Sequence, residues 1–255
     1  MRYLNMSFKS SVNTVLVAVL VLSLTPFLSE RAYAQSLNGV RGKRVAQEAQ
    51  SQAVDLGLPS GLKWAAGNVG AKNPWDYGMY FAWGGVDGQR NDSQVRECWS
   101  FDMNHYINSR CSQLSSDVSP EYDAAHVNLG GKWRMPTYKE FEELALNCNW
   151  SWTEDYKGTG VAGAVITSKS NGNSIFFPAS GKICGKELCL ERLYGLYWTS
   201  SCFKSSLAFQ FCFRLCMSGI GVRAHTIVQH LSQQEGVWVS HDFRYYGKPV
   251  RGVCE

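Results

Sequence analysis

The order of apolar and polar residues changes sharply within the first part of the chain. Residues 12–28 form an apolar run, and the basic residues Arg2 and Lys9 precede it. This order is typical of a secretory signal peptide. The run is shorter than the roughly 20 residues that a membrane-spanning helix needs, and Pro26 interrupts its end. The pattern therefore favours a signal peptide over the alternative, an uncleaved membrane anchor.

Two small residues, Ala32 and Ala34, follow the apolar run at the spacing of a signal-peptidase site. We expect cleavage after Ala34, which makes residues 1–34 the signal peptide. Residues 35–52 are polar without a hydrophobic period and predict a flexible leader. The folded domain is then expected over residues 53–255, without a later transmembrane span. Such a protein is exported to the periplasm, the cell surface or the exterior.

One segment of the expected domain, "TYKEFEELALNC" at residues 137–148, has a clear helical period. Thr137 stands three positions before Glu140, which is the spacing of a capping box. The apolar residues that recur on one side of the helix are Phe141, Leu144 and Ala145. The segment therefore predicts an amphipathic helix with a capped start.

Beyond this helix the apolar residues alternate with a period of two, which predicts strands. The expected strands lie within residues 149–153, 161–181, 194–201, 206–216 and 237–253. Asn171-Gly172 divides the second of these segments and is a strong hairpin signal. In the segment 206–216, one strand face is strongly apolar and should be buried; its residues are Leu207, Phe209, Phe211, Phe213 and Leu215. The pattern thus predicts one helix and several strands.

Composition narrows the classes of function. The formal net charge is +4, and removal of residues 1–34 takes away three basic residues and one acidic residue, which leaves +2. This nearly neutral charge gives no reason to expect a nucleic-acid partner. Aromatic residues make up 13% of the chain, which favours a β-rich fold with large packed rings.

Several motifs occur in one order along the domain. They are "VDLGLPSGLKWAAGNVGA", "YGMYFAWG", "DAAHVNLGGKWRMPTYKEFEEL", "NGNSIFFPASG", "YGLYWTSS" and "RYYGKPVRGV". Together they resemble the Fibrobacter succinogenes major paralogous domain family, a group of exported bacterial proteins. The resemblance runs from about Val54 to Val253. The chain departs from the family pattern at "VNLGGKW", where Trp is common before the Gly pair, and at "VRGV", where "VRPV" is usual.

The resemblance implies an α+β fold of the C-type-lectin-like kind, which is related to formylglycine-generating enzymes. In such folds the first and last strands pair, short helices flank twisted antiparallel sheets, and long loops form one surface. It implies no activity, and no catalytic residue can be carried over from it. The most recognisable block is expected to build the scaffold, through Trp133, Arg134, Pro136, Thr137 and Glu140.

Three features of this block suggest chemistry at first sight. His126 lies near Asp123 but lacks the nucleophile of an acid–base site, so we interpret it as a residue that fixes a turn. Gly130-Gly131 matches no phosphate-binding motif and predicts a turn with positive φ before a short strand at Trp133. Arg134 is expected to pair with a carboxylate or with loop carbonyls.

All nine cysteines follow the predicted signal peptide, and an exported chain can hold disulfides. Cys184 and Cys189 flank "GKEL" and are a possible disulfide pair. An odd number leaves at least one thiol free or paired between molecules. Cys212 and Cys216 lie in one expected strand, about 13 Å apart, and cannot bridge each other. They are therefore a poor pair for an enzyme of the formylglycine-generating type.

No metal or other cofactor is expected. The sequence has no C-x-x-C, we place no His at metal spacing to a Cys pair, and the sugar-binding calcium motifs of C-type lectins are missing. Asp87 and Asp92 lack the alternating acid spacing of a calcium loop.

Aromatic residues are the candidate ligand contacts. Trp75, Tyr77 and Tyr80 cluster with Trp83 in residues 74–83, where their flat faces suit sugars or protein partners. A glycine-punctuated aromatic run is also typical of a core. Trp238 is the fourth candidate, and we expect the functional face on the loops 87–122 and 216–242.

The sequence thus leads to a non-catalytic binding module of the bacterial envelope or exterior, with a glycan or protein ligand. One alternative is a sulfatase-modifying enzyme. The other is a structural envelope or fimbria-associated subunit that forms an intermolecular disulfide through an odd cysteine, for which Cys254 at a mobile chain end is the candidate.

Overall fold

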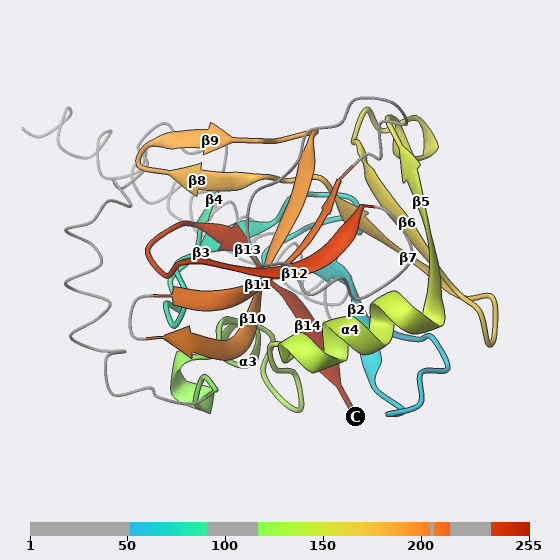
Figure 1. Ribbon diagram of the computed structural model, residues 1–255, viewed down its shortest axis with the longest axis horizontal. Coiled ribbons are helices and arrows are strands. Elements are labelled where there is room, and N and C mark those ends of the chain that lie inside the picture. The colour runs from blue at the N-terminus through green and yellow to red at the C-terminus, as the bar shows by residue number, and fades with distance from the viewer. Residues whose placement is uncertain (1–51, 91–116, 205–206, 215–235) are drawn as a thin grey trace, which may run out of the picture. The chain divides into compact units, whose positions relative to one another are not determined.

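The computed structural model describes residues 52–90, 117–204, 207–214 and 236–255 (Figure 1). The predicted signal peptide, its cleavage site at Ala34 and almost all of the predicted leader lie outside these residues. Large parts of the two loops on which we expected the functional face also lie outside them. Among the described residues, mostly antiparallel strands are accompanied by two α-helices, which agrees with the predicted α+β class.

One sheet holds both the first and the last strand. In spatial order it consists of β1 (Ala53–Asp55), β2 (Lys63–Asn68) and β14 (Arg251–Cys254). Trp64 on β2 lies opposite Val54 on one side and Val253 on the other, and it has no exposed surface. The resemblance implied a direct pairing of the first and last strands. In the structure both strands flank β2 instead.

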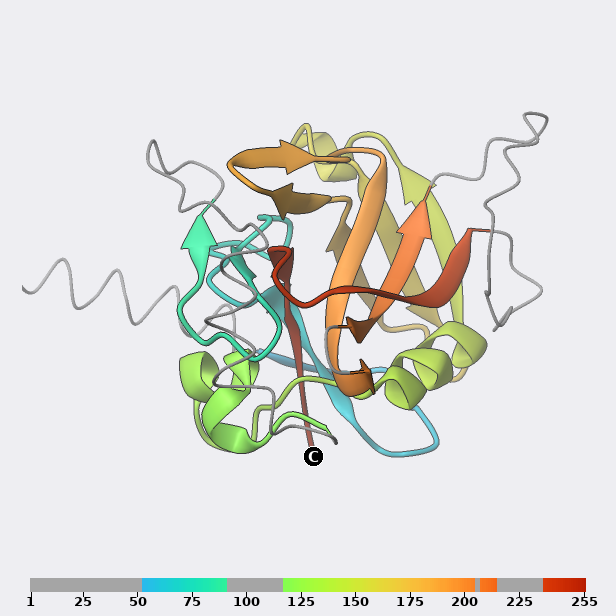
Figure 2. The ribbon, with the colours of Figure 1, turned by 60° about the vertical axis from the view of Figure 1, so that its left-hand side comes forward.

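A second sheet packs against the predicted helix. The sheet runs in the order β10 (Tyr194–Lys204), β11 (Leu207–Arg214) and β12 (Val237–Phe243), and the helix is α4 (Tyr138–Asn147) (Figure 1, Figure 2). Phe141 of α4 stacks on Phe211 of β11, with ring centroids 4.4 Å apart. The predicted apolar strand face is therefore buried where α4 covers it. Ala208 and Cys212 on the opposite face of β11 are buried as well, which the alternation did not predict.

The third sheet continues from α4. It consists of β5 (Cys148–Thr153), β6 (Gly163–Ser168) and β7 (Ser174–Pro178). The predicted hairpin at Asn171-Gly172 joins β6 to β7, and Gly172 has φ 75°. A 2.9 Å hydrogen bond from Ser168 N to Asn173 O closes this turn. Trp150 of β5 contacts Phe211, so this sheet and the second share one apolar core.

Two small sheets complete the strands of the described part. One has the order β13 (Lys248–Pro249), β3 (Met79–Phe81) and β4 (Gln89–Arg90), and the other is the hairpin of β8 (Lys182–Cys184) and β9 (Glu187–Cys189). Ile183 of β8 exchanges two backbone hydrogen bonds with Gly247, at 2.8 and 3.0 Å. The hairpin is thereby held beside β13 (Figure 1).

The segment before α4 differs from its prediction as a turn and a short strand. Residues Ala124–Leu129 form a short helix, α3, and Asp123 caps it by accepting a 2.8 Å hydrogen bond from His126 N. Arg134 forms only an isolated bridge to Val253. The helix is too short to show a period, and the packing of its buried alanines beside Trp133 stabilises it. Two single-turn 3₁₀ helices, η1 (Pro120–Tyr122) and η2 (Tyr156–Gly158), lie in the connections.

The described residues include no helix that is both long and apolar enough to span a membrane.

Candidate functional site

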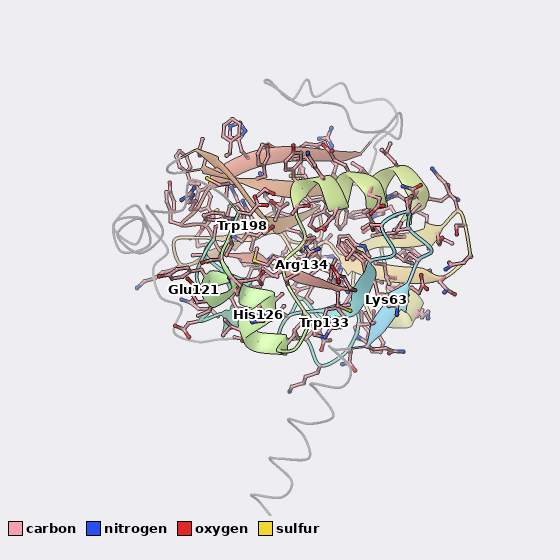
Figure 3. The ribbon with its side chains drawn as sticks, turned by 90° about the horizontal axis from the view of Figure 1, so that it is seen from below. Lys63, Glu121, His126, Trp133, Arg134 and Trp198 are labelled. Atoms are coloured by element: carbon pink, nitrogen blue, oxygen red, sulfur yellow. The ribbon has the colours of Figure 1, made fainter. Side chains whose placement is uncertain are left out.

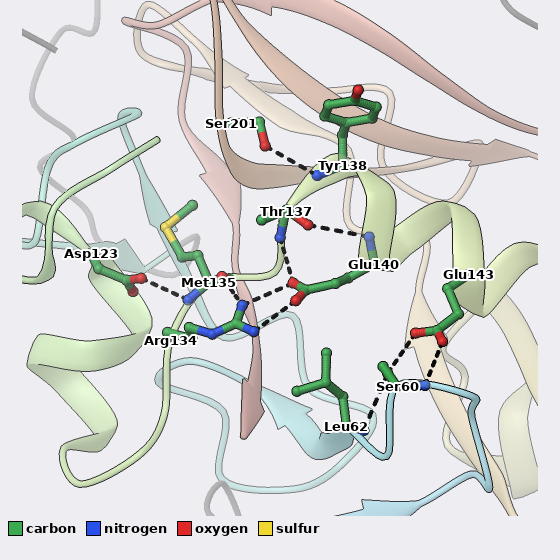
Figure 4. Close-up of polar contacts among 10 residues, drawn as sticks. All are labelled: Ser60, Leu62, Asp123, Arg134, Met135, Thr137, Tyr138, Glu140, Glu143 and Ser201. Carbon is green, nitrogen blue, oxygen red and sulfur yellow. Dashed lines mark hydrogen bonds and ion pairs between the residues drawn. The ribbon is translucent and has the colours of Figure 1, made fainter. Parts of the chain in front are cut away.

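The most recognisable sequence block forms a network of polar contacts at the start of α4 (Figure 4). Glu140 accepts hydrogen bonds from both terminal nitrogens of Arg134, at 2.7 and 2.8 Å, and from Thr137 N at 2.8 Å. Thr137 Oγ1 accepts in return from Glu140 N at 3.3 Å, which confirms the predicted capping box. Burial alone would raise the pKa of Glu140, but the bonds from Arg134 and Thr137 outweigh it and lower the pKa. The predicted pairing of Arg134 with a carboxylate is confirmed.

The rest of the block is equally tied to the scaffold (Figure 3). Trp133 is buried, and Pro136 O accepts a 2.8 Å hydrogen bond from Ser200 N of β10. His126 Nδ1 lies 3.1 Å from Trp133 O, so the imidazole fixes the loop, as interpreted from the sequence. Asp123 also accepts a 2.8 Å bond from Met135 N. The His126 and Asp123 side chains therefore hold the backbone of this block in place.

The glycine pair of the same block adopts the predicted backbone conformation. Gly130 has φ 72° and Gly131 has φ 59°. Both values lie in the left-handed region that favours glycine, so the pair permits the turn that leads from α3 to Trp133.

The aromatic cluster of residues 74–83 divides between surface and core. Tyr80 and Trp83 have no exposed surface. Tyr80 Oη donates a 2.7 Å hydrogen bond to Ser180 O. Because its ring is buried, it cannot contact an external ligand, and the prediction of Tyr80 as a ligand contact is wrong. Trp75 and Tyr77 remain half-buried. Tyr77 packs against the buried cluster of Tyr80 and Ile183, so it is also part of the scaffold.

The fourth candidate, Trp238, lies on a face of the second sheet that is opposite to α4. Strand register places the following residues on this face: Tyr194, Leu196 and Trp198 of β10, Ala208, Gln210, Cys212 and Arg214 of β11, and Trp238, Ser240 and Asp242 of β12. We call it the Trp238 face. Its middle is buried, whereas Tyr194, Arg214 and Trp238 at one end are half-buried. That end therefore combines two aromatic rings with a guanidinium group at the surface.

The three half-buried side chains contact one another. The rings of Tyr194 and Trp238 meet edge to face, with centroids 6.4 Å apart and an interplanar angle of 86°. Arg214 Cζ lies 6.0 Å from the Tyr194 centroid and 5.9 Å from the Trp238 centroid, at the limit for cation–π attraction. Arg214 Nη1 also donates a 3.3 Å hydrogen bond to Tyr194 Oη. Because β10, β11 and β12 each contribute one of these residues, the backbone fixes their spacing.

A buried charge cluster occupies the other end of the Trp238 face. Asp242 Oδ2 accepts hydrogen bonds from Lys182 Nζ of β8 and Lys248 Nζ of β13, each 2.8 Å long. Burial lowers the pKa of Lys248 to about 8, against the opposing effect of Asp242. Burial alone would raise the pKa of Asp242, yet the two ammonium groups lower it. Asp242 therefore stays ionised and joins three strands.

None of the cysteines that the structure describes forms a disulfide. Cys212 lies in the middle of the Trp238 face, where burial raises its pKa to about 12, so it is not a thiolate at neutral pH. Cys216, its suggested partner in enzyme chemistry, lies outside the described residues. The prediction that Cys254 lies at a mobile chain end is wrong. Cys254 is buried in β14, where the strand register places it opposite Lys63 of β2. No group of three or more potential metal ligands occurs within the described ranges.

The sequence analysis named Trp238 as a candidate contact but did not point to the residues that the structure places around it. Tyr194 and Arg214 belong to strands that the period predicted, and their pairing depends on a register that the sequence does not show. Lys182 and Lys248 gave no signal, because lysine is almost always exposed unless it is paired. Comparison of the chain with protein-family models, with curated proteins and with solved structures finds no match.

Proposed function

We propose that this chain is an exported, non-catalytic binding module of the bacterial envelope or exterior, with a glycan as its ligand. The signal-peptide pattern supports export, and the ordered motif blocks support membership of the Fibrobacter succinogenes major paralogous domain family with its lectin-like fold. The observation that carries the proposal is the contact of Tyr194, Arg214 and Trp238 at the surface end of the Trp238 face.

These three side chains combine the two kinds of contact that a sugar needs. An aromatic ring offers a flat apolar surface with a polar edge, which suits the C–H face of a sugar ring. The guanidinium of Arg214 presents several N–H donors in a fixed plane, and these suit hydroxyl or carboxylate oxygens. Half-burial means that the rings are already ordered before binding, which reduces the entropy lost when a ligand binds.

A glycan array and a pull-down with residues 35–255 test this proposal. We expect glycan binding that Trp238→Ala and Tyr194→Ala abolish. Trp152→Ala is the matched control, because Trp152 is a half-buried tryptophan on β5 that contacts the other face of the second sheet through Phe213. Circular dichroism checks that each variant is folded.

Three outcomes would contradict the proposal. A folded protein that binds neither glycans nor proteins would refute the binding module. Capture of a protein without any glycan signal would replace the glycan by a protein ligand. Loss of binding in Trp75→Ala, with Trp238→Ala unchanged, would move the site to the half-buried surface at Trp75.

A further inference from the structure

The β8–β9 hairpin brings two cysteines to one of its faces. A two-residue turn at Gly185 and Lys186 joins the strands, and Gly185 has φ 62°. The register pairs Lys182 with Cys189, and Cys184 with Glu187. Since side chains alternate along a strand, these four residues share one face. Cys184 and Cys189 are therefore diagonal neighbours across the ribbon.

The two thiols are close enough to interact. Diagonal Cα atoms in a sheet are about 7–8 Å apart, slightly beyond the usual span of a disulfide. Two-stranded ribbons twist more strongly than wide sheets, and twist shortens one diagonal. Burial is the largest cause of the raised pKa of Cys184, and the neighbouring Cys189 thiol also raises this pKa. Both residues are half-buried free thiols, so small oxidants can reach them.

The same face of the hairpin carries a residue of the charge cluster. Lys182 donates its 2.8 Å hydrogen bond to Asp242, and its ammonium lies 3.9 Å from the centroid of the Tyr246 ring. The opposite face is anchored, because Ile183 is buried against Tyr80. β8 is thus held by the core and by Gly247, whereas β9 is the outer strand of this two-stranded sheet. A cross-link between the strands would fix β9 against β8, directly beside Lys182.

We propose that Cys184 and Cys189 form a reversible disulfide that closes the β8–β9 hairpin and holds Lys182 against Asp242 at the edge of the Trp238 face. The oxidant is a disulfide bond. It belongs either to glutathione disulfide or to a thiol-oxidising protein in the compartment to which the chain is exported. One cysteine attacks it as the thiolate, which forms a mixed disulfide, and the second cysteine then displaces the reduced thiol. Two thiols lose two protons and two electrons, and the oxidant becomes two thiols.

The environment of the pair sets the expected speed of this exchange. Burial raises the pKa of Cys184 to about 11, so little of its thiolate exists at neutral pH. Because thiolate is the attacking form, oxidation should accelerate as the pH rises. The ring that the bond closes is small, so its effect on the unfolded chain is small, and the main effect is on the position of the hairpin.

The sequence provides a direct test of the cross-link. Trypsin cleaves after Lys182, Lys186 and Arg192, which separates the two cysteines into peptides 183–186 and 187–192. The protein is treated with oxidised glutathione, alkylated and digested. We expect mass spectrometry to show the two peptides as one disulfide-linked species, which dithiothreitol separates into its two peptides. Cys184→Ser and Cys189→Ser remove this species. The proposal would be overturned if both thiols were alkylated after the oxidising treatment, or if either formed a disulfide with another cysteine.

The link to Lys182 needs a second readout. Acetylation of lysines by acetic anhydride, measured by mass spectrometry after chymotryptic digestion, reports their accessibility. The Lys182–Asp242 bond is already present with both thiols reduced, so we expect slow labelling of Lys182 in either state, and slower labelling in the oxidised protein than after reduction or in Cys189→Ser. Lys186 is the control, because it is exposed at the turn in either state. Equal labelling of Lys182 in both states would refute the link. Neither readout uses a ligand, so failure here leaves the proposed glycan site standing.

Discussion

The Lys248 ammonium lies 3.7 Å from the centroid of the Trp198 ring, although the Lys248 side chain has no exposed surface. Its charge is balanced by Asp242, which also binds Lys182. A buried lysine is stable only with such a partner, because an uncompensated buried charge is very costly. Asp242 is therefore the residue on which this part of the fold depends.

The first prediction concerns this carboxylate. Asp242→Asn leaves two ammonium groups facing each other without a counter-charge, so it should lower the free energy of unfolding by about 3 kcal/mol. Lys248→Met should cost much less, because Asp242 keeps Lys182 and the methionine fills a similar volume. Urea denaturation measures both, with Lys72→Met at an exposed position as the control. Equal costs for Asp242→Asn and Lys248→Met would contradict this assignment.

The second prediction concerns pH. The pKa of Lys248 is about 8 in the folded protein, below its ordinary value of 10.5. Between these two values the unfolded chain binds the proton that the folded protein lacks, so stability rises with pH. The stability of the natural protein relative to Lys248→Met should therefore increase from about pH 8 to 10.5. Denaturation of both proteins at several pH values measures the difference. A difference that is constant over this window would contradict the lowered pKa.

The third prediction separates the two roles of Glu140. Thr137→Ala removes the cap of α4 and should cost about 1 kcal/mol of stability. Glu140→Ala should cost more, because Arg134 also loses both of its hydrogen bonds to this carboxylate. Urea denaturation compares the variants, and Glu142→Ala, which lies outside the Arg134 contact, serves as the control. Equal losses for Thr137→Ala and Glu140→Ala would show that the ion pair contributes nothing.

The fourth prediction concerns the ring stack between α4 and the second sheet. Phe141 and Phe211 lie nearly parallel, with an interplanar angle of 11°. A double-mutant cycle with Phe141→Leu and Phe211→Leu should give a coupling of about 0.5–1.5 kcal/mol, the range for aromatic pairs. Denaturation of the four proteins provides the cycle. Additive losses would mean that the rings contribute only by the area that they bury.

Local features were predictable because their causes are local. The capping box at Thr137 and Glu140, the period of α4 and the turn at Gly172 each depend on residues within a few positions of one another. The positive φ of Gly130 follows from the same short-range reasoning. Such features need no knowledge of what the segment packs against.

The missed features depend on packing. α3 is too short for a period and is stabilised by its contact with the core around Trp133. Tyr80 was a candidate contact because it lies in an aromatic segment, and only the fold shows that it has no exposed surface and that its hydroxyl donates to Ser180 O. Cys254 looked mobile because it is next to the chain end, but it belongs to a strand.

The sequence by itself determined the helix α4 and the β6–β7 hairpin, since periodicity, capping and turn residues act within a few positions. The tertiary structure decided which side chains share a face. Lys182 and Asp242 are 60 positions apart, and Tyr194 meets Arg214 and Trp238 only through the register of three strands. Register and burial depend on how strands distant in the chain pair, so the charge cluster and the aromatic site become visible only in the folded molecule.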